Sequence, residues 1–103
     1  PQQLGYMKHK KGHKIKPHLH NKVERTVNFT FEVLFIKSGV VKVNFYNLNK
    51  EHLESNILNK GDVILLAFGG HGFEIIEDAE MIEVKQGPYA GDDDKTRFDS
   101  LVE

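Results

Sequence analysis

The stretch GHKIKPHLHN, residues 12–21, places His18 and His20 one residue apart. On a β-strand, side chains two residues apart project from the same face, so both imidazoles would point at one spot. Neutral imidazole is a common ligand of divalent transition-metal ions, but two ligands do not make a tight site. The stretch therefore predicts half of a metal site, whose other ligands come from elsewhere in the chain.

Two further residues are candidates for the other half. Glu32 stands within TFEVLFI, where a carboxylate on an apolar strand is costly unless it is paired or bound to a cation. His71 follows Gly69 and Gly70, and a backbone that lacks Cβ atoms can bend so that the imidazole turns inward. Both residues occupy positions where an ionisable side chain is unusual, and a shared metal site would explain both positions.

These segments together resemble the two sequence motifs of the cupin superfamily. The resemblance rests on GHKIKPHLH at 12–20, EVLFIKSG at 32–39 and GDVILLAFGGHG at 61–72. In that family a His-x-His pair, a glutamate and a later histidine bind one metal ion inside a small β-barrel. The resemblance implies one divalent transition-metal ion (Fe, Mn, Ni, Co or Zn), and the ligands that it implies are His18, His20, Glu32 and His71.

The spacing leaves a second candidate for the glutamate ligand. Eleven residues separate His20 from Glu32, whereas the family usually has three or four, and Glu24 stands at that shorter distance. Glu32 is the preferred ligand because its neighbours place it within a strand. Glu24 lies beside Arg25 in a polar stretch, where a surface ion pair is a sufficient explanation.

Composition limits the class of protein. The chain of 103 residues has 28% charged residues and a formal net charge of −1, which gives no electrostatic footprint for nucleic acid or an anionic membrane. It has no cysteine, which excludes disulfides and thiolate metal sites and is compatible with a reducing compartment, so we expect a cytoplasmic protein. No apolar run approaches the roughly 20 residues needed to span a bilayer.

The elements that would position these residues are short strands. Residues 26–37, TVNFTFEVLFIK, are rich in β-branched and aromatic types, and no window carries a helical apolar period. Seven or eight antiparallel strands are expected, and with the resemblance they predict an all-β jelly-roll barrel, the double-stranded β-helix of the cupins. The expected turns and breaks are Ser38-Gly39, Lys60-Gly61-Asp62, Gly69-Gly70 and Asp78-Ala79.

The chain is expected to form one domain over residues 1–103, with 88–103 as an irregular C-terminal arm held by Phe98 and Leu101. Within 26–37 both faces of the strand are partly apolar. The odd-numbered face carries Phe29, Phe31, Val33 and Phe35, and the even-numbered face carries Leu34 and Ile36. A strand with two apolar faces favours a second sheet or a second subunit on one of them, so we expect a homodimer.

The remaining polar residues receive simpler interpretations. Three residues where the last strand ends, at the mouth of the expected barrel, are candidates for contact with a small-molecule substrate: Lys85, Gln86 and Tyr89. The other three histidines are expected on the solvated surface, and the two arginines in surface ion pairs: His9, His13, His52, Arg25 and Arg97.

A metal ion with three histidines and one carboxylate keeps one or two positions open, which suits an isomerase or epimerase, a dioxygenase, or a hydrolytic enzyme. We therefore expect a metal-dependent enzyme that acts on a small polar molecule. The resemblance to short cupins of bacterial surface-polysaccharide metabolism implies a carbohydrate or nucleotide-sugar. Two alternatives stay open: a non-catalytic ligand-binding or sensor module, and a metal-independent sugar-nucleotide ketoisomerase that uses His18 and His20 as acid and base.

Overall fold

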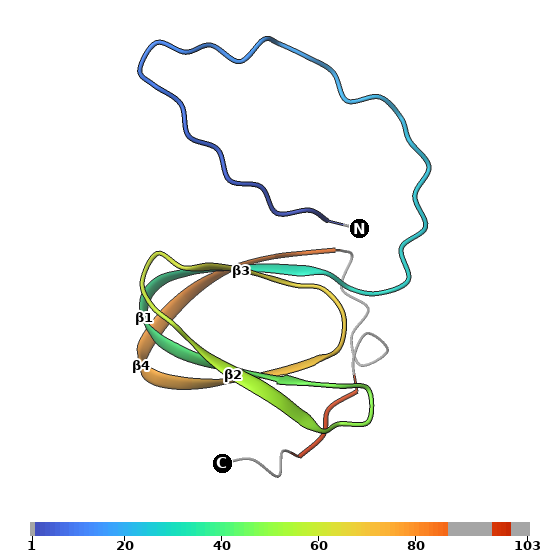
Figure 1. Cartoon of the computed structure of the whole chain (residues 1–103), viewed down its shortest axis with the longest axis vertical. Coiled ribbons are helices and arrows are strands. Elements are labelled where there is room, and N and C mark those ends of the chain that lie inside the picture. The colour runs from blue at the N-terminus through green and yellow to red at the C-terminus, as the bar shows by residue number, and fades with distance from the viewer. Residues whose placement is uncertain (1, 87–95, 100–103) are drawn as a thin grey trace.

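The computed structural model describes residues 2–86 and 96–99, and in this part the chain is all-β (Figure 1). Its four strands form one antiparallel sheet: β1 Glu32–Tyr46, β2 His52–Leu58, β3 Val63–Leu66 and β4 Gly70–Lys85. The described residues contain no helix with the length and apolar character needed to cross a membrane. The expected fold class, all-β with antiparallel strands, is confirmed.

β1 is the centre of the sheet. β4 pairs with β1 along its whole length, from Glu32 opposite Lys85 to Tyr46 opposite Gly70. The other edge of β1 is shared, with β3 beside its first half and β2 beside its second half. A turn at residues 59–62 joins β2 to β3, and it remains tied to β1 because the Ile36 amide donates to the Asp62 carbonyl at 2.9 Å.

The sheet bends in the middle of β1. The β1–β4 register shifts three times between Ile36 and Val41, and Gly39 has a φ of 85°, a left-handed conformation that favours glycine. Opposite Gly39 lie Asp78 and Ala79 of β4, so both strands bend at the same level. Figure 1 shows β1 and β4 curling together, which brings the two halves of the sheet face to face.

The core fills the space between these two halves. Its buried residues come from three strands: Leu34, Ile36, Val41, Val43, Leu58 and Leu66. Leu34 and Ile36 point inward from the first half of β1, whereas Phe35 between them is 37% exposed. The even-numbered face of this strand is therefore the core face, and Glu32 belongs to it.

Replacing Ile36 with alanine tests this core. Ile36 is fully buried, so the loss of its side chain is expected to lower the free energy of unfolding by about 2–5 kcal/mol. The matched control is Ile57→Ala, because Ile57 is 53% exposed and the same truncation should cost less than about 1 kcal/mol. Urea denaturation of both variants measures the difference. Equal losses would contradict the assigned core.

The expected number of strands was wrong. Ser38-Gly39 and Asp78-Ala79 were predicted to be turns that end strands, but both lie inside long strands, β1 and β4. The two bends face each other, so β1 and β4 continue to pair on both sides of them through the register shifts. The turn around Gly61 and the break at Gly69 are confirmed, since both separate strands.

The sheet of the described residues is not closed, so a jelly-roll barrel is not confirmed. Residues 2–31 form no strand, and residues 3–29 are exposed throughout. The strand predicted over 26–37 therefore begins only at Glu32, because earlier residues have no neighbouring strand to pair with. We refer to residues 2–28 as the N-terminal arm, which Figure 1 shows as a wide loop leading away from the sheet.

Residues 88–95 and 100–103 of the expected C-terminal arm, Leu101 among them, lie outside the described residues. The described part of it, residues 96–99, forms no strand. Phe98 packs edge-to-face against Tyr46, with 5.1 Å between the ring centroids. The expectation that Phe98 holds this segment to the sheet is confirmed.

Candidate functional site

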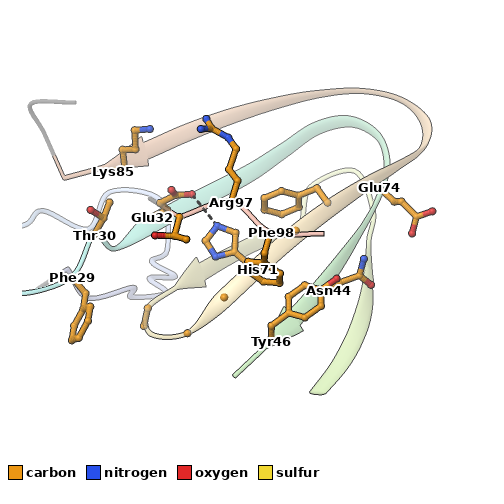
Figure 2. Close-up of a pocket in the computed structure, with 16 residues that line it drawn as sticks. Phe29, Thr30, Glu32, Asn44, Tyr46, His71, Glu74, Lys85, Arg97 and Phe98 are labelled. Atoms are coloured by element: carbon orange, nitrogen blue, oxygen red, sulfur yellow. Dashed lines mark ion pairs between the residues drawn. The ribbon is translucent and has the colours of Figure 1, made fainter. Parts of the chain in front are cut away.

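A cavity of about 760 Å³ opens at the end of the folded sheet, between the start of β1 and the start of β4 (Figure 2). Its ionisable lining residues come from both halves of the sheet and from the C-terminal segment: Glu32, His71, Glu74, Lys85 and Arg97. Its aromatic lining residues are Phe29, Tyr46, Phe73 and Phe98. The lining therefore combines both signs of charge with flat apolar surfaces.

Glu32 and His71 meet inside this cavity. His71 Nε2 lies 3.8 Å from Glu32 Oε2, and the two side chains are 29% and 15% exposed. In the ladder between β1 and β4 they are far apart, because Glu32 pairs with Lys85 while His71 pairs with Phe45. The bend of the sheet is what brings them together, so the pair depends on the fold and not on local sequence.

Glycines set the position of His71. Gly69 has a φ of 100° and turns the chain into β4, and a Cβ on it would lie 3.1 Å from the Tyr46 carbonyl oxygen. A Cβ on Gly70 would lie 3.2 Å from the Cβ of Tyr46 and 3.4 Å from the ring of Phe98. The expectation that these glycines let His71 turn inward is confirmed.

Lys85 lies next to Glu32, since the two residues pair across β1 and β4 and so share a face of the sheet. Its ammonium group also lies 3.2 Å from the Glu83 carboxylate. Arg97 lines the same cavity from the C-terminal segment (Figure 2). Phosphate or carboxylate groups suit such cations, whereas hydroxyl groups suit the carboxylate.

A buried polar chain supports the far wall of the cavity. Asn44 is only 7% exposed, and its Oδ1 accepts a 2.5 Å hydrogen bond from the Ser55 hydroxyl. His52 Nε2 lies 2.8 Å from the same hydroxyl oxygen, and its ring packs edge-to-face on Tyr46. Because Ser55 gives its one hydrogen to Asn44, Nε2 of His52 is the donor. The expectation that His52 is a solvated surface residue was wrong.

The predicted ligands His18 and His20 lie in the N-terminal arm. Both are exposed, and neither lines the cavity. Their rings are neighbours, with 5.1 Å between centroids, and Nδ1 of His18 donates to the Lys16 carbonyl at 2.9 Å. The two histidines therefore lie close to each other, as their spacing predicts, but the structure does not bring them to Glu32 and His71.

The four-ligand metal site does not fit this arrangement. Two of its four expected ligands, Glu32 and His71, lie together, and two ligands are too few for a tight site. Within residues 2–86 and 96–99, no group of three or more histidine, aspartate or glutamate side chains could hold an ion. The metal site stays a prediction, and no chemical step is derived through it.

Of the two glutamates considered as ligands, Glu32 lines the cavity, whereas Glu24 is exposed in the arm. Lys85 lines the cavity, as expected for a residue that contacts substrate. Gln86 has a structural role instead, because its side-chain oxygen accepts from the Phe31 amide at 3.0 Å and fastens the start of β1. Tyr89 lies outside the described residues.

Sequence reasoning missed several residues of the cavity. Arg97 was assigned to a surface ion pair but lines the cavity. The available signal was its neighbour Phe98, which was expected to pack against the sheet and would bring Arg97 with it. Asn44 and Tyr46 carried no signal, because the alternation of residues 41–46 set them on the polar face opposite Val41, Val43 and Phe45, where such residues are ordinary. Arg25, His9 and His13 are exposed as expected, and the rings of the two histidines stack at 4.3 Å.

Comparison with protein-family models, with curated proteins and with solved structures finds no match for this chain. The chemistry of the cavity is therefore argued from its own residues. A histidine faces a carboxylate, two cationic side chains stand nearby, and aromatic rings form part of the wall. This set can bind a polar molecule with an anionic group and can exchange protons with it.

Proposed function

We propose that the protein is a small cupin-like enzyme that binds an anionic polar molecule in the cavity, with the Glu32–His71 pair as its acid and base. The 3.8 Å approach of these two side chains inside the cavity is the observation that supports the proposal most. A sugar phosphate or nucleotide-sugar has the matching features, and the resemblance to short bacterial cupins favours the same class.

His71 is the residue that would exchange protons with the substrate. Its Nε2 faces the Glu32 carboxylate at 3.8 Å, beyond hydrogen-bond distance, and a closer approach in the substrate complex would let the carboxylate orient the ring. His71 would take a proton from a carbon next to a carbonyl group and return it to the neighbouring carbon while the hydroxyl proton passes to the carbonyl oxygen, which isomerises the substrate. In an epimerisation a second acid on the opposite face would return the proton to the same carbon. The proposed reaction class is therefore isomerisation or epimerisation.

Lys85 is expected to contribute to binding of the anionic group. Charge-assisted hydrogen bonds from a part-buried ammonium group are worth about 1.5–3 kcal/mol, so Lys85→Ala should weaken binding of a nucleoside-diphosphate sugar by about tenfold or more. Lys60→Ala is the control, because Lys60 is exposed in the turn between β2 and β3 and does not line the cavity. Isothermal titration calorimetry measures both affinities, and equal affinities would argue against an anion at Lys85.

Deuterium exchange tests the chemistry itself. A panel of nucleoside-diphosphate sugars and ketose phosphates is first screened by thermal shift, and each binder is then incubated with the protein in D₂O. Proton transfer at carbon predicts incorporation of deuterium next to the carbonyl group, which NMR detects even when the equilibrium favours the substrate. A ligand that binds tightly and never exchanges or changes would reject the enzyme and support the binding or sensor module.

A metal-dependent version of this function is the second candidate. Its support is that Glu32 and His71, the two expected ligands that belong to the sheet, lie side by side. Movement of the arm to the cavity would have to supply His18 and His20.

Elemental analysis of the purified protein decides this, with Glu32→Gln and Glu24→Gln analysed beside it. Near-stoichiometric metal that is lost only in Glu32→Gln would support the metal site. An active wild-type protein without metal would reject the metal-dependent function and favour the metal-independent proposal, in which Glu32 and His71 act as acid and base.

A further inference from the structure

β4 has a free edge. Among the residues that the structure describes, this strand of 16 residues pairs with β1 on one side and with no strand on the other. Six large apolar side chains of β4 are at least 36% exposed: Phe73, Ile75, Ile76, Met81, Ile82 and Val84. Natural proteins rarely leave a long apolar edge strand uncovered, because it offers unpaired backbone groups to any strand that approaches.

The end of the N-terminal arm has the pattern of a strand that lacks a neighbour. Between residues 18 and 29 four odd-numbered positions are apolar and at least 50% exposed: Leu19, Val23, Val27 and Phe29. The even-numbered positions between them are polar throughout. This alternation is typical of a half-buried strand, yet no residue of the segment belongs to a strand in its own subunit.

Charge matches the two segments. The arm, residues 2–28, has a formal charge of +6, of which residues 18–28 contribute +1 and the five lysines at residues 8–16 contribute +5, so the rest of the chain carries −7. β4 contains five acidic residues and one lysine: Glu74, Glu77, Asp78, Glu80, Glu83 and Lys85. The other free edge, formed by β2 and β3, has a single acidic residue, Glu54. Two β4 strands side by side would set like charges against each other, which disfavours that pairing.

The base of the arm directs it away from the β4 of its own subunit. Phe29 packs edge-to-face on Phe68, which follows β3, with 4.9 Å between the ring centroids. β3 and β4 pair with opposite edges of the same part of β1, residues 32–35. The arm therefore leaves the sheet on the β3 side, and Figure 1 shows it curving away from the strands.

From these observations we infer that two copies of this chain exchange arms, with residues 18–29 of each copy added as a strand to the free edge of β4 in the other. The exchange is reciprocal and closed, as in a two-fold dimer. It pairs the backbone of both segments, sets the apolar residues of the arm beside those on one face of β4, and places the basic arm next to the acidic strand. The inference is independent of the chemistry in the cavity.

Charge reversal tests the exchange in the full-length chain. The arm variant carries Lys16→Glu, Lys22→Glu and Arg25→Glu, and the β4 variant carries Glu77→Lys and Glu80→Lys. The wild type is expected to sediment at twice its mass of 11.8 kDa at micromolar concentration. In the arm variant the charge of residues 18–29 becomes −3 and faces the acidic β4, and in the β4 variant the charge of β4 falls from −4 to zero, with two new lysines facing the basic arm. The dimer dissociation constant of each variant should therefore rise at least about tenfold.

Mixing the two variants separates exchange between copies from other kinds of dimer. In the mixed dimer the acidic arm segment of one copy faces a β4 in which two glutamates are replaced by lysine, and the unaltered arm faces an unaltered acidic β4. Equimolar mixing should therefore restore a dimer close to wild-type affinity. Failure of mixing to restore it would overturn the inference, as would a monomeric wild type or a dimer that neither variant weakens.

A cross-link identifies the source of the arm directly. The chain has no cysteine, so Val23→Cys in one chain and Ile76→Cys in another introduce single reactive groups. A short bismaleimide should join the two variants into a covalent heterodimer when they are mixed. If it instead closes only within a chain that carries both substitutions, the arm covers the β4 of its own subunit, and exchange is wrong.

Discussion

Gly39→Ala is expected to lower the free energy of unfolding by about 3–5 kcal/mol, a loss large enough to unfold a small domain. A Cβ at this position would overlap the carbonyl oxygen of Asp78 and would lie 2.6 Å from the Cα of Ala79. Both are backbone atoms of the facing bend in β4, so relief would require the two strands to separate. The φ of 85° adds the strain of a left-handed conformation. Urea denaturation followed by circular dichroism measures the loss.

Gly61→Ala is the matched control for this prediction. Gly61 has a similar φ of 91°, but a Cβ there would meet no atom within 4 Å. Only the conformational strain remains, which is about 1–2 kcal/mol for an L-residue. A similar loss in both variants would show that the bend tolerates a side chain, and it would contradict the close contact between Gly39 and β4.

His71→Gln is expected to reduce turnover of the identified substrate by about 10²–10⁴-fold, because it removes the group proposed to transfer the proton. Glu32→Gln keeps the size of the side chain but removes its charge, and we expect a loss in the lower part of that range. Because the two residues act as a pair, the double variant should be little slower than His71→Gln alone. Steady-state kinetics of the three variants measures these ratios.

His52→Gln is the control for loss of a histidine. His52 interacts with Ser55 and Tyr46 behind the cavity wall and does not line the cavity, so this variant should keep turnover within a few-fold while losing some stability. Turnover that survives His71→Gln but falls in His52→Gln would place the chemistry elsewhere. Circular dichroism of every variant confirms that an inactive protein is still folded.

The alternation of apolar and polar residues was sufficient to predict an all-β antiparallel fold, but it could not say which face of β1 is the core. Both faces of residues 29–36 are apolar, and the structure buries Leu34 and Ile36 while leaving Phe35 37% exposed. The choice depends on the second half of the sheet, which folds over the even-numbered face and brings Val41, Val43 and Leu58 into the same core. No local pattern contains that information.

The predicted number of strands was wrong for a related reason. A glycine beside a small polar residue has the same local signature in a turn that ends a strand and in a bend within one. At Gly39 the difference lies in the partner, since β4 bends at Asp78 and Ala79 and keeps pairing on both sides. Only the long-range register decides between the two outcomes.

The residues of the candidate site that could be predicted are those whose type is unusual for their position in the sequence. Glu32 on an apolar strand and His71 after two glycines were singled out for that reason, and they meet in the cavity. Asn44, Tyr46 and Arg97 could not be found in this way, since their positions look ordinary until the sheet folds over. The closeness of His18 and His20 follows from their local spacing and is observed. Their distance from Glu32, in contrast, depends on how the arm docks.

The pairing of β1 with β4 also has a kinetic consequence. It joins the first residue of β1 to the last residue of β4, and every other strand lies between them in the chain. One edge of β1, beside the fully buried Val41 and Val43, stays unpaired until β4 has been synthesised and has closed a long loop. A nascent chain in which β4 is still incomplete would expose this apolar strand with one edge unpaired, so we expect chaperone binding and aggregation to depend on when β4 leaves the ribosome.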